Sequence, residues 1–403
     1  MPSRYASLSR PDLATLVPEL LLIGQLIDRS GMAWCIAAWG REEMAQVAIE
    51  EWAGSSPVYT RRMQRALRYE GTDVVTIFKG LQLDIGAPPQ FMDFRYDVQD
   101  PWHGTFHLDH CGALMDVEPM GVSYVRSMCH DIEDPTFDAT AVATNPKAQV
   151  RPVHRPPRTP ADRHPHCAWT VTIDESHPEV TPLPPYHVIA RTRAAGLELD
   201  PIDPADEGAA DYSGPLVSDV DFAAFSHSAL VRIADEVCLQ MHLLNLSFVH
   251  AVRRRATDDE QALEIATRQL VGVAGIAAER IARALRTDDP MRVLELHPLL
   301  NPAAYVDATV EGTTLTVRPS PAWEDAAWIA LCGPARVRPL QALLRAVDPH
   351  LDVEVEGSPW RWTASVVRRD EPAPEADEVS VTRLSTGSSF AFESRRSLPI
   401  TPV

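Results

Sequence analysis

The chain has 403 residues, of which 45% are hydrophobic and 23% charged, as in an ordinary globular protein. At roughly 100–200 residues per domain, this length predicts two or three domains, each with its own core. The formal charge of −19 would repel a phosphate backbone, and no basic stripe with interleaved aromatic residues is present, so we expect no nucleic acid partner.

Neither a membrane span nor a secretion signal is evident in the sequence. The most apolar run, Leu20–Ile27, is far shorter than the ~20 residues that cross a bilayer. The segment Met1–Arg10 lacks an apolar stretch leading to a cleavage site. Six cysteines do not make a secreted disulfide scaffold. We therefore expect a cytoplasmic protein with no membrane partner, and a homo-oligomer is compatible with this.

Two helical stretches, beginning at Ser9 and Ser226, resemble each other. At a shift of 217 residues (226 − 9), Ser9, Leu13, Leu16 and Glu19 fall on Ser226, Leu230, Ile233 and Glu236. At a shift of 218 residues (280 − 62), the seven residues Arg62–Arg68 fall on Arg280–Arg286 with five identities. A matched order of this kind indicates an internal repeat.

The repeat continues into strand-like sequence. Thr105–Asp109 and Thr314–Arg318 alternate in the manner of half-buried strands. Ala168–Ile173 and Arg361–Val366 both carry a Trp-Thr pair. Helices rich in Ala and Arg can look alike by composition alone, but the paired Trp-Thr strands favour duplication. The sequence therefore predicts an α+β fold: a tandem duplication about a pseudo-two-fold axis, each copy a helical half followed by a small antiparallel sheet.

These segments predict four regions along the chain. We expect residues 1–177 to form the first copy and residues 219–370 a degenerate second copy. The segment 178–218 is rich in Pro, Asp and Gly and has the composition of a linker. The segment 371–403 has little apolar surface to bury and is expected to be a loosely ordered tail.

Cysteine and histidine cluster in the first copy. Three of the six cysteines and seven of the fourteen histidines fall between His103 and Cys167. Thiolate and imidazole are the preferred protein ligands of zinc and iron. The spacing is not a paired CxxC pattern. The candidate metal ligands are Cys111, Cys129, Cys167, His107, His110 and His166. We expect zinc, with iron or an iron–sulfur cluster as the alternative.

The second copy lacks most of this cluster. Approximate alignment of the strands places Ser320, Cys332 and Trp360 at the positions of the three cysteines. A metal that the fold needed would be present in both copies, so the cluster predicts a functional site in the first. The alternative is that the thiols are small buried hydrophobic groups and the histidines merely collect in loops.

Short motifs in the first copy resemble a known enzyme family. Cys111-Gly112, Cys129-His130-Asp131, and Arg158 followed by Cys167-Ala168-Trp169 resemble the L-2-amino-thiazoline-4-carboxylic acid hydrolase family. More distantly, they resemble vinyl-reductase-type small-molecule-binding domains. The resemblance covers residues 8–175, with a degenerate echo over 219–370. Arg163-His164-Pro165-His166 replaces an expected Gly-Asp pair, and His107 and His110 are additional. The resemblance implies opening of a small nitrogen- or sulfur-containing ring by water.

These residues predict a metal-dependent hydrolase or lyase acting on a small molecule. A three-ligand metal would activate a bound water, and His130 or Asp131 would serve as general base. Arg155 and Arg158 would bind a substrate carboxylate, although arginines in such a loop can equally be solvated. One alternative is a small-molecule or metal-sensing module without turnover. Another is an iron or iron–sulfur redox enzyme.

Overall fold

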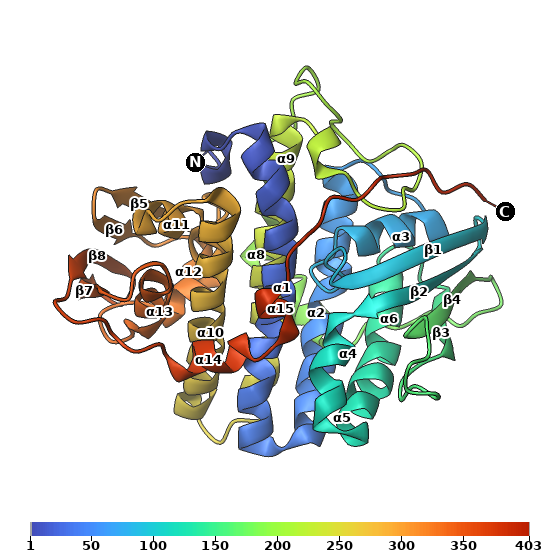
Figure 1. The fold of residues 1–403 in the computed structure, drawn as a ribbon, viewed down its shortest axis with the longest axis horizontal. Helices are drawn as coiled ribbons and strands as arrows, with labels where there is room; N and C mark the ends of the chain where they lie inside the picture. The colour runs from blue at the N-terminus through green and yellow to red at the C-terminus, as the bar shows by residue number, and fades with distance from the viewer. Residues whose placement is uncertain (1, 403) are drawn as a thin grey trace.

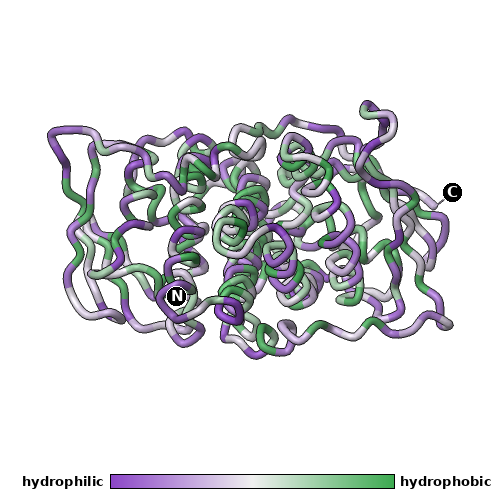
Figure 2. Tube along the Cα trace, turned by 90° about the horizontal axis from the view of Figure 1, so that it is seen from below, coloured by the Kyte–Doolittle hydropathy of each residue, from purple (hydrophilic) through white to green (hydrophobic). Residues whose placement is uncertain are grey.

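The computed structural model describes residues 2–402. The chain forms two units in which long helices precede a four-stranded antiparallel sheet, so the predicted α+β tandem duplication is confirmed. Four long helices occupy the centre of the molecule, and the two sheets lie at its opposite ends (Figure 1). Figure 2 shows the same elongated arrangement from below, with the central helices seen nearly end on.

Both units carry helical segments between their second and third strands. The first unit consists of α1 (Arg10–Trp39), α2 (Arg41–Ala66), α3 (Val74–Gln82), β1 (Met92–Asp100), β2 (His103–Cys111), α4 (Gly112–Val117), η2 (Glu118–Met120), α5 (Val122–Arg126), η3 (Ser127–Ile132), α6 (Glu133–Ala141), β3 (Ala148–His154) and β4 (Cys167–Ile173). The second consists of α9 (His227–Arg253), α10 (Asp259–Leu285), α11 (Pro290–Leu296), η5 (Pro298–Leu300), β5 (Ala308–Glu311), β6 (Thr314–Val317), α12 (Pro321–Glu324), η6 (Trp328–Leu331), α13 (Arg338–Val347), β7 (Leu351–Ser358) and β8 (Arg361–Arg368).

The same local signals begin and end the paired helices. The Ser9 hydroxyl accepts a hydrogen bond from the Asp12 amide at the start of α1, and Ser226 accepts one from Ala229 at the start of α9. After α2 and α10 the chain turns through left-handed residues, Arg68 with a φ of 54° and Arg286 with a φ of 50°. The repeated Arg segments thus end equivalent helices.

The two sheets share one strand order. Their orders are β1-β2-β4-β3 and β5-β6-β8-β7, with every neighbouring pair antiparallel. The strands predicted around Thr105 and Thr314 are β2 and β6, and the Trp-Thr strands are β4 and β8. Trp169 and Trp362 are both buried, as expected for strands that turn one face to the core.

The helices of each unit pack mainly on helices of the other. Helix α2 packs against α9, and α1 packs against α10 and α9. Arg62 donates from two nitrogens to Glu236 at 2.8 and 3.1 Å, and Arg280 donates to Glu19 at 2.6 Å. All four side chains are buried. Since Glu19 matches Glu236 and Arg62 matches Arg280, the two buried ion pairs are reciprocal between the two units.

The segments expected to be a linker and a loose tail make specific contacts in the structure. The linker carries α7 (Pro184–Ile189) and α8 (Arg193–Gly196), and Lys79 donates to the carbonyl of Tyr212 in the linker at 2.9 Å. The short helix η4 (Phe222–Ala224) precedes α9 in the second unit. The tail carries α14 (Asp377–Arg383) and α15 (Thr386–Ser389) and crosses to the first unit, where the Ile400 amide donates to Leu216. The low apolar content of these two segments did not predict that they are anchored, because backbone hydrogen bonds supply many of the anchoring contacts.

Helix α1 is long and apolar enough to span a bilayer by length and composition, although the run Leu20–Ile27 alone is too short. Most of its apolar stretch is buried among the other helices. These features are those of the central helix of a bundle.

Candidate functional site

The structure brings the three cluster cysteines into one apolar region. Cys111 ends β2 and accepts a hydrogen bond from the Leu114 amide at 3.3 Å. Cys129 lies in η3, a turn of π-helix, and Cys167 begins β4 opposite Leu108. All three thiols are buried in the same hydrophobic cluster. Residues distant in sequence therefore converge, as the paired strands predict.

These thiols are not arranged to hold a metal. Among residues 2–402, no three His, Cys, Asp or Glu side chains are placed to share one ion. Burial, with Glu133 adding to it, raises the pKa of Cys111 to about 12 and the pKa of Cys129 and Cys167 well above the ordinary thiol value. In the metal-free protein these thiols are therefore neutral, and a metal would have to displace their protons on binding.

Two of the candidate histidine ligands, His110 and His166, belong to a cluster of histidine rings. His110, His164 and His166 form a small ring cluster, with ring centroids of neighbouring pairs 6.0 and 5.1 Å apart. Burial, followed by the nearby Arg158, lowers the pKa of His166 to about 4. His107 is half-exposed and lies 3.4 Å from Asp109. Neutral imidazoles can bind metals, but in the described part of the chain no three of these imidazoles and thiols are placed to share one ion.

The predicted base and substrate-binding residues are engaged elsewhere. A ring nitrogen of His130 lies 2.7 Å from the Pro156 carbonyl, and Asp131 is exposed. Arg155 pairs with Asp134. Arg158 donates to both oxygens of Glu118, a further residue of this loop region, at 3.0 and 2.9 Å. None of the four predicted residues lines the cavity described below.

The buried thiols should be unreactive in the folded protein. We expect iodoacetamide at about pH 8 to leave Cys111, Cys129 and Cys167 unmodified, because the thiolate is the nucleophile and burial suppresses it. Mass spectrometry after labelling in buffer and in concentrated guanidinium measures this. Labelling should appear only after unfolding. Rapid modification of any of the three in buffer would show an exposed, activated thiol.

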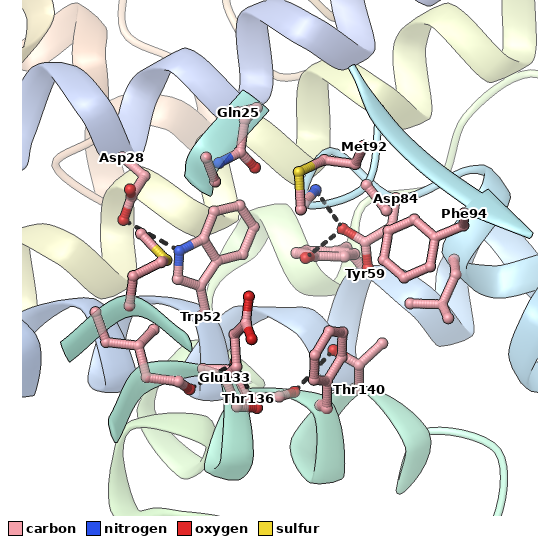
Figure 3. A pocket seen from close by; sticks show the side chains of 17 residues that line it. Gln25, Asp28, Trp52, Tyr59, Asp84, Met92, Phe94, Glu133, Thr136 and Thr140 are labelled. Atoms are coloured by element: carbon pink, nitrogen blue, oxygen red, sulfur yellow. Dashed lines mark hydrogen bonds between the residues drawn. The ribbon is translucent and has the colours of Figure 1, made fainter. Parts of the chain in front are cut away.

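A cavity of about 90 Å³ lies beside the cysteine cluster, between the first-unit helices and β1 (Figure 3). This volume holds several waters or a small organic group. Its walls come from α1, α2, α3 and the loop after it, β1, α4, η3 and α6. They comprise Gln25, Asp28, Trp52, Tyr59, Leu81, Asp84, Gly86, Ala87, Met92, Phe94, Ala113, Met128, Ile132, Glu133, Thr136, Phe137 and Thr140.

Two aspartates in the wall are held by aromatic donors. Trp52 Nε1 donates to Asp28 at 3.1 Å, and Tyr59 Oη donates to Asp84 at 2.8 Å. The Gly86 amide also donates to Asp84 at 2.7 Å. Burial raises the pKa of Asp28, and it raises the pKa of Asp84 to about 6 against the opposing effect of its hydrogen bonds. Both carboxyls are therefore fixed in orientation and poorly solvated.

Glu133, the first residue of α6, supplies the third carboxyl. Figure 3 shows it pointing from α6 into the cavity, with Asp28 and Asp84 on either side. Its Oε2 is buried and accepts no hydrogen bond from the described residues. Burial raises the pKa of Glu133 to about 8, although Arg155 acts to lower it. A buried polar atom without a partner requires an explanation, and a bound ligand supplies one.

A π-helical turn borders the cavity. The six residues of η3, Ser127–Ile132, connect α5 to α6, and Met128 and Ile132 from this turn line the cavity. Such turns are rare and occur frequently at functional sites. The Cys129-His130-Asp131 motif therefore lies beside the candidate site, although its side chains do not form the cavity wall.

The second copy has lost the equivalent carboxyl. At the shift of 217 residues, Asp28 and Trp52 correspond to Asn245 and Gln269, whose amides hydrogen-bond at 2.8 Å as the first pair does at 3.1 Å. Gln25 corresponds to His242, whose ring packs between Tyr305 and Trp328 at centroid distances of 4.9 and 5.1 Å. Large aromatic groups and a neutral amide thus occupy this part of the second copy.

Comparisons with known proteins leave the family open. No protein-family model, curated protein or solved structure matches this chain. The resemblance to the hydrolase family therefore stays a prediction. The site is accordingly interpreted from its own geometry.

Proposed function

We propose that the first copy binds a small molecule in the carboxyl-lined cavity, with the second copy as its scaffold. The observation that carries the proposal is the Glu133 oxygen, unpartnered among the described residues, that faces a cavity lined by aromatic rings. Binding sites for small molecules are typically concave and mostly apolar with a few converging polar groups. The amide and aromatic replacements in the second copy support one site per chain.

Hydrolysis of the bound molecule is a second candidate. With pKa values of about 6 and 8, Asp84 is mainly ionised and Glu133 mainly protonated near pH 7. Two carboxyls in opposite protonation states can act as general base and general acid. This chemistry needs no thiolate ligand. The proposed reaction is still hydrolysis of a small molecule, but Asp84 and Glu133 take the place of His130 and Asp131 as its catalytic residues. The predicted metals and the cytoplasmic location remain predictions.

Filling the cavity should abolish binding. Ala113 lies in the wall and is buried, so Ala113→Phe would place a benzyl group in the space that a ligand needs. We expect fragments that bind the unmodified protein to lose at least about tenfold in affinity in this variant, a difference of about 1.4 kcal/mol. Ligand-detected NMR with a library of small amines, alcohols and carboxylic acids measures the change.

Two further variants make this test decisive. Thr136→Trp fills the same cavity from α6 and guards against misfolding of the first variant. Arg65→Ala alters a larger open groove between the units and should leave binding unchanged. Binding that survives both filling variants, or that is lost only in Arg65→Ala, would place the site outside the cavity.

A further inference from the structure

The hydrogen-bond donors in the cavity wall are already engaged within the protein. Trp52 donates to Asp28, and Tyr59 donates to Asp84. The Thr136 hydroxyl donates to the Ile132 carbonyl at 2.8 Å, and Thr140 donates to the Thr136 carbonyl at 3.1 Å. In its favoured orientation, the Gln25 amide nitrogen faces the carbonyls of Ile85 and Gly86. The remaining side-chain donor is the carboxyl O–H of Glu133 in its protonated form, which is lost when Glu133 ionises.

Acceptors, in contrast, remain available. Each of Asp28 and Asp84 accepts its hydrogen bonds on one oxygen, Oδ1, and Oε2 of Glu133 accepts none from the described residues. The residues that line the cavity include no Lys, Arg or His. The wall therefore presents carboxyl oxygens from three separate elements, and none of the lining side chains carries a positive charge to neutralise them.

The nearest cations are directed elsewhere. Arg29 follows Asp28 on α1, but its Nε lies 3.5 Å from Asp116 and it lines a neighbouring cavity. Arg155 pairs with Asp134 and lies over the Trp169 ring at 5.8 Å. A metal ion is not the complementary charge, since no three ligating side chains among residues 2–402 can share one ion. A larger organic cation can contact carboxyls that are spread over several walls.

We infer that the ligand of this cavity carries a protonated amine, held by Glu133 together with Asp28 or Asp84, on a short aromatic or apolar body. An ammonium group supplies up to three donors, enough for the free oxygen of Glu133 and one of the aspartates. Charge-assisted hydrogen bonds to buried carboxylates are about twice as strong as neutral ones. The rings of Trp52 and Phe94 in the wall favour a cation and an apolar body together.

Matched probes test this inference, which rests on the proposed function. Benzylamine, benzyl alcohol and benzoate have similar size and differ in charge. We expect calorimetry near pH 7 to show benzylamine binding at least about tenfold more tightly than benzyl alcohol, and no binding of benzoate. Binding of benzylamine should release a proton, since Glu133 would ionise to meet the ammonium group. Repeating the titration in two buffers of different ionisation enthalpy measures that release.

Isosteric variants identify the carboxyls. Glu133→Gln should weaken benzylamine binding, as should either Asp28→Asn or Asp84→Asn, and all three variants should leave benzyl alcohol binding nearly unchanged. Asn245→Asp, the matched change in the second copy, should alter neither. Equal affinity for benzylamine and benzyl alcohol, unchanged benzylamine binding in all three variants, or binding of none of the probes would overturn the inference. The proposed function is judged separately, by whether any fragment binds the unmodified protein and loses affinity in the filling variants.

Discussion

Replacing Arg280 with methionine should lower the free energy of unfolding by about 3–5 kcal/mol, because Glu19 would remain buried without its partner. The Arg280 side chain is fully buried and also donates to the carbonyls of Gly387, Ser388 and Phe390 in the tail. Its loss therefore removes an ion pair and an anchor of the C-terminal segment. Chemical denaturation followed by circular dichroism measures the change.

The chain offers matched controls for this prediction. Arg62→Met should cost less, since Glu236 would keep its hydrogen bonds to Arg232 at 3.1 and 3.0 Å. Arg268→Met breaks a partly exposed pair with Glu264 and should cost less than about 1 kcal/mol. Combining Arg280→Met with Glu19→Leu should recover part of the stability. A loss for Arg280→Met no greater than that for Arg268→Met would contradict a structural role for the buried pair.

The second large effect is a dependence of stability on pH through Glu133. Its pKa is raised to about 8, from an ordinary value of 4.5 in the unfolded chain. Between these values the folded state keeps a proton that the unfolded state releases, so stability falls as the pH rises through this window. Glu133→Gln removes this loss. The variant should match the unmodified protein near pH 4 and be about 2 kcal/mol more stable above pH 8.

Denaturation curves at several pH values provide the measurement. Asp131→Asn serves as the control, since Asp131 is exposed only two residues away and its change should stay within about 0.5 kcal/mol at every pH. A constant difference between Glu133→Gln and the unmodified protein across this range would show that Glu133 is solvated in the folded state.

Much of the fold could be predicted because the sequence contains two related copies that can be compared with each other. The match of Glu19 to Glu236 and of Arg62 to Arg280 located equivalent helices, and their cross-pairing explains why these residues are retained in both copies. The Trp-Thr strands are recognisable in both copies for a similar reason, since each buries a tryptophan in the core of its unit. Residues that must pack the same way in both copies therefore repeat in the sequence, and the repeat can be recognised before the structure is known.

The candidate site was harder to find from sequence. Cysteine and histidine drew attention by residue type, yet no three of these side chains among residues 2–402 are placed to share one ion. Asp28 and Asp84 lie in an apolar helix and a short loop, where a single acid carries no motif. One signal was available: at the shift of 217 residues, Asp28 falls on Asn245, a loss of charge between otherwise similar helices. Only the folded arrangement unites Asp28 and Asp84 with Glu133.

The reciprocal ion pairs also bear on how such a chain could arise. When each half neutralises the buried acid of the other, the contact is self-complementary, as in a two-fold homodimer whose subunits present the same surface. A single ancestral half could therefore have assembled with a second copy of itself before the two were joined in one gene. Once they were joined, selection could act on each half alone. The interior of one half could then change to improve packing, while the other half retained a cavity for a ligand.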